Sequence, residues 1–276
     1  MCELYTLKLK RNVFAYIKRS SNDKILTKEI YDYYGEDESV WLYKLWSNIY
    51  IKNSEIIRIP KLNQLKSLKI YKCKKIESIP ELKQLSSLIL LYCNKIERIG
   101  EMNTLTSLKI KGCNNIKTVG EMKRLTKVSL DNYKMSDMLK LNNLTSIKIH
   151  GDNEIIQIPK LNHLTRIDLH LCNEIKEIIE HKQLISLRIL YCDKMERIAK
   201  MRNLKCLKIM GCDNIKIIPK LKCLTLLYLN RCESIKEIPE LKCLTNLVIT
   251  KCGKMKTIES INKKEIMEYI RSINEI

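Results

Sequence analysis

The stretch IPKLNQLKSLKIYKCKKIES, residues 59–78, decides the fold, because edited copies of it follow one another down to residue 257. The next copy, residues 79–98, reads IPELKQLSSLILLYCNKIER, and the last, residues 238–257, reads IPELKCLTNLVITKCGKMKT. A fixed period of this length predicts a solenoid, in which each unit packs only on its neighbours. The ten copies begin at Ile59, Ile79, Ile99, Val119, Met138, Ile158, Ile178, Ile198, Ile218 and Ile238.

Within a copy, numbered from 1 to 20, apolar residues recur at positions 1, 4, 7, 10, 12, 15 and 18. In the first copy these positions hold Ile59, Leu62, Leu65, Leu68, Ile70, Cys73 and Ile76. All five prolines of the chain stand at position 2. Because proline fixes φ and disfavours helix in the residue before it, the segments that return from one copy to the next should be extended or 3₁₀.

The pattern Leu65-x-x-Leu68-x-Ile70-x-x-Cys73-x-x-Ile76 resembles the leucine-rich repeat in its cysteine variant. The resemblance implies a β-dominated α/β horseshoe, in which each copy adds one strand to a parallel sheet on the concave face. It also implies an irregular or 3₁₀ convex side, because a 20-residue copy leaves too little chain for a convex helix. Positions 10 and 12 should then point into the core and positions 9, 11 and 13 out of the concave face, since side chains alternate along a strand.

The chain divides into an N-terminal cap at residues 1–58, the repeats at 59–257 and a C-terminal helical cap at 258–276. Solenoid ends need closing, so a cap is the simplest role for each terminal segment. Residues 24–34 and 40–50 are predicted to be short helices. The run WLYKLWSNIYI at residues 41–51 also resembles the end of an F-box, which leaves open an adaptor that recruits a ubiquitin ligase, although the Leu-Pro pair that opens an F-box is missing.

Cysteine occupies position 15 in most copies, at Cys73, Cys93, Cys113, Cys172, Cys192, Cys212, Cys232 and Cys252. Thiols that recur every 20 residues form a line along the stack, whereas zinc requires four ligands that converge on one point. No C-x-x-C pair occurs, so we expect a structural column and no metal. With no export signal visible, the thiols are expected to be reduced, which indicates an intracellular, cytoplasmic protein.

Catalytic chemistry has little support in the sequence. His150 and His170 share position 13 of adjacent copies, and Asp168 lies near them. A base with an orienting carboxylate is not an active site without a nucleophile, a pocket or a metal. We therefore expect a protein that is not an enzyme, has no cofactor or small-molecule substrate, and keeps its four histidines on the solvated surface.

Positions 9, 11 and 13 carry the functional prediction, because they are strongly basic in a chain with a formal net charge of +20. Only Asp131 and Asp168 oppose this charge in the three positions. The predicted partner-binding residues are Lys69, Lys109, Lys111, Lys127, Lys148, Arg166, Arg188, Lys208, His150, His170 and Tyr228. A basic face predicts a scaffold that binds an acidic protein surface. A bias of the overall composition toward lysine, without a role in binding, stays an alternative explanation for part of this positive charge.

Nucleic acid is the alternative partner, because counterion release rewards any large basic surface. Single-strand binders stack bases on aromatic side chains, and the basic face offers only Tyr71 and Tyr228 by this assignment. An acidic protein is therefore favoured. No membrane partner is expected, since no window approaches the roughly 18 apolar residues of a membrane span.

Overall fold

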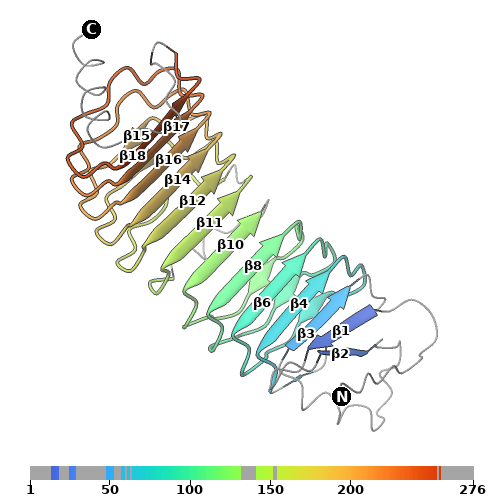
Figure 1. Ribbon diagram of the computed structural model, residues 1–276. Coiled ribbons are helices and arrows are strands. Elements are labelled where there is room, and N and C mark those ends of the chain that lie inside the picture. The colour runs from blue at the N-terminus through green and yellow to red at the C-terminus, as the bar shows by residue number, and fades with distance from the viewer. Residues whose placement is uncertain are drawn as a thin grey trace, which may run out of the picture. The chain divides into compact units, whose positions relative to one another are not determined.

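The computed structural model describes residues 14–18, 25–28, 48–52, 57–59, 61–62, 64–131, 141–151, 154–253 and 255. The chain divides into two compact units, Met1–Tyr133 and Lys134–Ile276, which we call unit 1 and unit 2. Each unit is a stack of parallel strands about 20 residues apart, as the repeat predicts (Figure 1). The prediction of a repeat solenoid is therefore confirmed.

The main sheet of unit 1 has the strand order β10-β8-β6-β4-β3-β1-β2. Its strands are β1 (Phe14–Lys18), β2 (Ile25–Lys28), β3 (Asn48–Lys52), β4 (Ser67–Tyr71), β6 (Ser87–Leu91), β8 (Ser107–Lys111) and β10 (Lys127–Asp131). From β3 to β10 the pairing is parallel, and β1 runs antiparallel to both β2 and β3. The parallel stack therefore begins before the first recognised copy of the repeat.

The main sheet of unit 2 is parallel throughout and has the order β18-β17-β16-β14-β12-β11. Its strands are β11 (Ser146–His150), β12 (Arg166–His170), β14 (Ser186–Leu190), β16 (Cys206–Met210), β17 (Leu226–Asn230) and β18 (Asn246–Thr250). Neighbouring strands pair residues that are 20 apart, for example Leu187 with Leu207. Equivalent positions of the repeat therefore form straight columns across the sheet.

Strict alternation of buried and exposed side chains explains why these residues form strands. In β4 the side chains of Leu68 and Ile70 are fully buried, whereas Ser67, Lys69 and Tyr71 lie at least partly in solvent. Branched and aromatic residues fit such a half-buried pleated surface. Each fully buried leucine or isoleucine contributes roughly 1.5–3 kcal/mol relative to an exposed one. A core one copy thick is thus stabilised by columns of aliphatic side chains.

Serine and threonine at position 8 link successive copies just before each strand. The Oγ of Ser86 donates to the carbonyl oxygen of Lys66 at 2.9 Å, and Thr106 Oγ1 donates to Ser86 O at 3.0 Å. The same bond recurs in unit 2, where Thr165 Oγ1 donates to Thr145 O at 2.9 Å. These hydroxyls donate hydrogen bonds to backbone carbonyl oxygens of the preceding copy, just before the parallel strands begin to pair.

The segments on the back of each unit, opposite the main sheet, were predicted to be extended or 3₁₀, and several of them are extended, whereas the prediction of an irregular or 3₁₀ back is wrong at those positions. Two-residue parallel strands form there instead. They are β5 (Ser78–Ile79), β7 (Arg98–Ile99) and β9 (Thr118–Val119) in unit 1, and β13 (Glu177–Ile178) and β15 (Arg197–Ile198) in unit 2. Successive copies place the same extended segment side by side, so their backbone groups pair; the N–H of Lys117, for example, donates to Glu97 O at 2.7 Å.

The helices predicted for residues 24–34 and 40–50 are wrong where the structure describes those segments. Ile25–Lys28 is strand β2 and Asn48–Lys52 is strand β3. Ile49 and Ile51 are buried and pair with Leu68 and Ile70, so tertiary pairing prevails over the local pattern. Trp41 and Trp46, together with the C-terminal segment 258–276 predicted to be a helical cap, lie outside the described residues. No helix is present within the part of the chain that the structure describes.

In every copy whose position 14 the structure describes, that residue follows the main strand and is left-handed. Lys72, Tyr92, Leu171, Tyr191, Arg231 and Lys251 all adopt positive φ there, between 51° and 57°. Glycine takes the same place at Gly112, Gly151 and Gly211, with φ of 57° to 67°. The left-handed turn sends the chain inward, so that the cysteine at position 15 becomes buried.

Candidate functional site

The first, third and fifth residues of the parallel main strands form a continuous outward surface on each unit, which we call the open face. The predicted partner-binding residues all belong to it. In unit 1 they lie on β4 (Lys69), β8 (Lys109, Lys111) and β10 (Lys127). In unit 2 they lie on β11 (Lys148, His150), β12 (Arg166, His170), β14 (Arg188), β16 (Lys208) and β17 (Tyr228).

Asp168 is the exception on the open face of unit 2, because it is buried, with 5% of its surface exposed. Its carboxylate lies between two cations on the adjacent strands, 3.9 Å from Lys148 Nζ and 3.7 Å from an Arg188 guanidinium nitrogen. The charge of Asp168 is therefore partly neutralised by these two side chains. Arg166 and Lys208 make no ion pair within the described residues, so their charges remain available at the surface.

Apolar side chains adjoin the cations of unit 2. Leu190 and Met210 follow the histidine column, and Leu226, Tyr228 and Val248 continue the open face over β17 and β18. All five are half-exposed. Lys208 Nζ lies 5.9 Å from the centroid of the Tyr228 ring, within range of a cation–π contact. The open face of unit 2 therefore combines basic and apolar groups on one sheet.

The two predicted neighbours His150 and His170 do stack, with ring centroids 4.3 Å apart, and Tyr191 continues the stack 5.7 Å from His170. Burial lowers the pKa of His170 from its usual value, and the charge of His150 lowers it further. His170 is therefore neutral at neutral pH. It contributes ring surface to the open face, and the positive charge comes from the lysines and arginines.

Unit 1 has a different composition on its open face. Lys111 Nζ is paired with the Asp131 carboxylate at 2.8 Å, and the hydrogen bond and charge of Asp131 raise the pKa of Lys111. No carboxylate occupies an outward position on β3, β4, β6 or β8. Lys69 projects from β4 and Lys109 from β8. The positive surface of unit 1 therefore centres on these four strands.

Sequence reasoning missed a cluster of tyrosines at this surface. Tyr50 projects from β3, and Tyr92 follows β6 with 44% of its surface exposed. The ring of Tyr71 lies 5.9 Å from that of Tyr92, edge to face. The sequence predicts Tyr50 in a helix and places Tyr92 outside positions 9, 11 and 13. Alternation of Asn48, Tyr50 and Lys52 with two isoleucines is the signal that could have identified β3.

The cysteine column is structural in its contacts. The thiols at position 15 are buried and donate to the carbonyl two residues earlier, as Cys93 does to Leu91 O at 3.3 Å. Neighbouring copies are joined too, because the N–H of Cys192 donates to Cys212 Sγ at 3.4 Å. The hydrogen bond with Cys172, supported by burial, raises the pKa of Cys192 to about 12. The Cys192 thiol is therefore unreactive at neutral pH.

His181 was expected at the surface, but it is buried, with 1% of its area exposed. It occupies position 4, where the adjacent copies hold Leu161 and Met201, also buried. Neither ring nitrogen makes a hydrogen bond of normal geometry within the described residues. Burial lowers the pKa of His181, and the backbone of Leu161 opposes this effect more weakly. Unit 2 therefore holds a neutral imidazole in a column of aliphatic side chains.

Replacing His181 with leucine should stabilise unit 2, and more so in acid. The unfolded chain takes up a proton near the ordinary histidine pKa of about 6.5, while the folded form resists protonation. Wild-type stability should therefore fall as the pH drops below about 6.5, by up to roughly 1.4 kcal/mol per pH unit. Urea unfolding of both proteins at neutral and acidic pH checks this. Parallel losses in the two proteins would contradict it.

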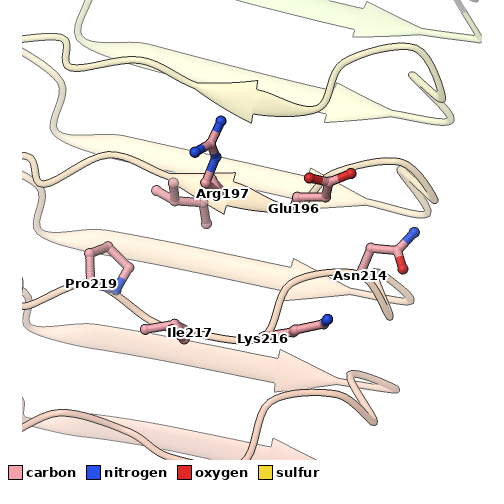
Figure 2. Close-up of a pocket in the computed structure, with 7 residues that line it drawn as sticks. Glu196, Arg197, Asn214, Lys216, Ile217 and Pro219 are labelled. Atoms are coloured by element: carbon pink, nitrogen blue, oxygen red, sulfur yellow. The ribbon is translucent and has the colours of Figure 1, made fainter.

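A shallow pocket lies on the back of unit 2 (Figure 2). Figure 2 shows Glu196 and Arg197 in one copy, Lys216 and Ile217 in the next, and Pro219 at the start of the copy after that. Ile217 has 75% of its surface exposed, and the Arg197 guanidinium is paired with Glu177 at 3.2 Å. The lining residues that the structure describes include charged groups of opposite sign, Glu196 and Lys216, but no histidine, cysteine, serine or threonine.

The described residues contain neither a group of metal-ligating side chains nor a membrane-spanning helix. No three His, Cys, Asp or Glu side chains come together there in a group that could hold a metal ion. That same part of the chain has no helix of the length and apolarity required to span a membrane. The sequence matches no family model and no curated protein. The fold places the protein among the β-solenoids built from short repeats, each of which contributes a parallel strand.

Proposed function

We propose that the protein is a non-enzymatic scaffold that binds an acidic protein surface on the open face of unit 2. One observation carries this proposal. Arg166 and Lys208 project from the same rigid sheet as Leu190, Met210 and Tyr228. Apolar and aromatic groups supply binding energy at an interface, while flanking charges select a partner and accelerate encounter.

The leucine-rich repeat, in its short cysteine variant, is the class that we infer for the repeats. Support comes from the spacing of Leu65, Leu68, Ile70 and Cys73, and from the parallel strand that each copy contributes. In that class the strand face is the recognition surface, which agrees with the placement proposed here. Reduced thiols in the cysteine column would further suit an intracellular compartment.

The adaptor hypothesis has gained no support. The end of the run that resembles an F-box, residues 48–51, belongs to strand β3 rather than to a helix. The rest of that run lies outside the described residues. The nucleic-acid alternative is favoured only by the tyrosine cluster of unit 1, and not by any group on the open face of unit 2.

Charge reversal tests the proposed surface. Arg166→Glu combined with Lys208→Glu should abolish capture of acidic proteins from a lysate of the native cell, because two cations of this face that make no ion pair with the residues the structure describes become repulsive. Neither residue pairs with Asp168, so the Lys148–Asp168–Arg188 group stays intact. Captured proteins are identified by mass spectrometry and compared with those captured by the wild type.

The matched control is Lys216→Glu combined with Lys236→Glu, two exposed positions on the back of unit 2. It changes the net charge by the same amount. We expect this variant to capture the same proteins as the wild type. Equal losses in the two variants would show that capture follows net charge, and the open face would no longer be the proposed site.

A further inference from the structure

We propose that the open face of unit 1 binds single-stranded nucleic acid through a tyrosine–lysine strip made by Tyr50, Tyr71, Tyr92, Lys52, Lys69, Lys72 and Lys111. This inference is independent of the function proposed for unit 2, because it concerns other strands and another class of partner. The strip lies entirely on β3, β4, β8 and the residues that follow β4 and β6.

Each tyrosine of the strip has a lysine ammonium group close to its ring. Lys69 Nζ lies 4.5 Å from the Tyr50 centroid, and Lys72 Nζ lies 5.2 Å from that of Tyr71. Lys111 Nζ is 5.9 Å from the Tyr92 ring. Rings that accept a flat partner, interleaved with cations that follow a phosphate backbone, are the two components of single-strand binding sites.

The backbone holds the strip in place. Lys72 and Tyr92 occupy the left-handed position after their strands, with φ of 53° and 57°. The Tyr92 ring also covers Gly112, since a Cβ on that glycine would lie 2.7 Å from Tyr92 Cδ1. A larger residue at position 112 would displace the ring. The sequence thus supplies glycine where the aromatic side chain needs to lie against the backbone.

Hydroxyl groups complete a phosphate-binding surface. Ser67, Ser87 and Ser107 are adjacent in the sheet and form the first column of the same open face. Serine hydroxyls and lysines commonly contact phosphates in nucleic-acid complexes. No carboxylate projects from the open face of β3, β4, β6 or β8. A polyanion therefore meets donors and cations across these four strands, and the Asp131 carboxylate on β10, which neutralises part of the Lys111 charge, borders this surface.

The composition favours nucleic acid over an acidic protein at this strip. Lysine is depleted in protein interfaces, whereas arginine and aromatic residues are enriched. Every cation of the strip is a lysine, in contrast with Arg166 and Arg188 on unit 2. The sequence argument against nucleic acid is a shortage of aromatic residues, and Tyr50 and Tyr92 remove that shortage. A single strand is the form expected, because its bases are free to stack on rings.

The test uses the full chain and fluorescence anisotropy with three probes: a labelled oligouridine of about 20 nucleotides, a duplex of the same length, and a labelled polyglutamate peptide. The single strand should bind tightest at equal salt. Tyr71→Ser combined with Tyr92→Ser leaves the charge unchanged and should weaken oligouridine binding at least about five-fold, because each stacked base depends on a ring. Polyglutamate binding should not change.

Two controls keep the result interpretable. Tyr191→Ser removes the equivalent ring of unit 2, which covers Gly211 as Tyr92 covers Gly112, and should leave oligouridine binding intact. Lys69→Gln with Lys72→Gln alters only side chains of the open surface that are at least partly exposed, and it should flatten the plot of log affinity against log salt, by a slope of about 0.7 for each phosphate that no longer meets a lysine. The proposal is overturned by wild-type affinity in both strip variants, by duplex binding as tight as single-strand binding, or by polyglutamate binding as tight as oligouridine binding.

Discussion

Replacing Leu187 with alanine should lower the free energy of unfolding by about 2–5 kcal/mol, because it removes a fully buried side chain from a core one copy thick. Leu187 is flanked by Ile167 and Leu207 in the adjacent strands, which are also fully buried. In a solenoid each copy is stabilised only by its neighbours, so a cavity in one copy weakens two interfaces. Urea unfolding followed by circular dichroism measures the loss.

Leu190→Ala is the matched control, because Leu190 lies on the same strand but projects from the open face. The same truncation should cost less than about 1 kcal/mol there, since the side chain projects from the sheet and is partly in solvent. Similar losses for Leu187→Ala and Leu190→Ala would contradict the assignment of inner and outer positions on β14.

Alanine at Gly211 should be the second most damaging change, at about 2 kcal/mol or more. Gly211 has φ of +58°, and an L-residue in the left-handed region costs roughly 1–2 kcal/mol. A Cβ at this position would also lie 2.5 Å from Cδ1 of Tyr191, so the ring would have to move. Both effects act against the folded state.

A double-mutant cycle with Tyr191→Ala separates the two effects. Without the ring, Gly211→Ala should retain only the cost of the left-handed conformation. Arg231→Ala provides a reference, because Arg231 already adopts φ of 51° without a glycine and should lose less than about 0.5 kcal/mol. If Gly211→Ala were equally costly with and without Tyr191, the ring would not explain the glycine.

The repeat period predicted the columns in which the same type of residue recurs at the same position of successive copies, either buried or projecting from the sheet. The column of Leu65, Leu85 and Leu105 is buried as expected, and Lys109 and Lys148 project from the open face. These outcomes follow from strand alternation, which depends only on neighbouring residues in the chain.

The features that periodicity missed depend on contacts between copies. Strand β3 forms because Ile49 and Ile51 extend the buried columns by one strand, although its sequence is not a recognisable copy. His181 is buried because it lies between Leu161 and Met201, the equivalent residues of the two adjacent copies. The polarity of histidine alone does not indicate this burial. Tyr92 joins the binding strip through a left-handed turn, and no local pattern identifies its orientation.

The open faces of the two units also differ in composition, and the net charge of the chain does not reveal this difference. A formal charge of +20 suggests one basic protein with one kind of partner. Asp168 neutralises part of unit 2, where arginines lie beside Leu190, Met210 and Tyr228. Unit 1 has lysines among tyrosines and serines. This difference in composition is the reason why we propose different partners for the two units.

The placement of protein binding on the open face of unit 2 rests finally on one comparison. It is the amount of each acidic protein captured by Arg166→Glu/Lys208→Glu, divided by the amount captured by the back-face variant Lys216→Glu/Lys236→Glu. The proposed function predicts a ratio near zero for the specific partners. A ratio near one, with both variants folded, would contradict it and place the partner elsewhere on the chain.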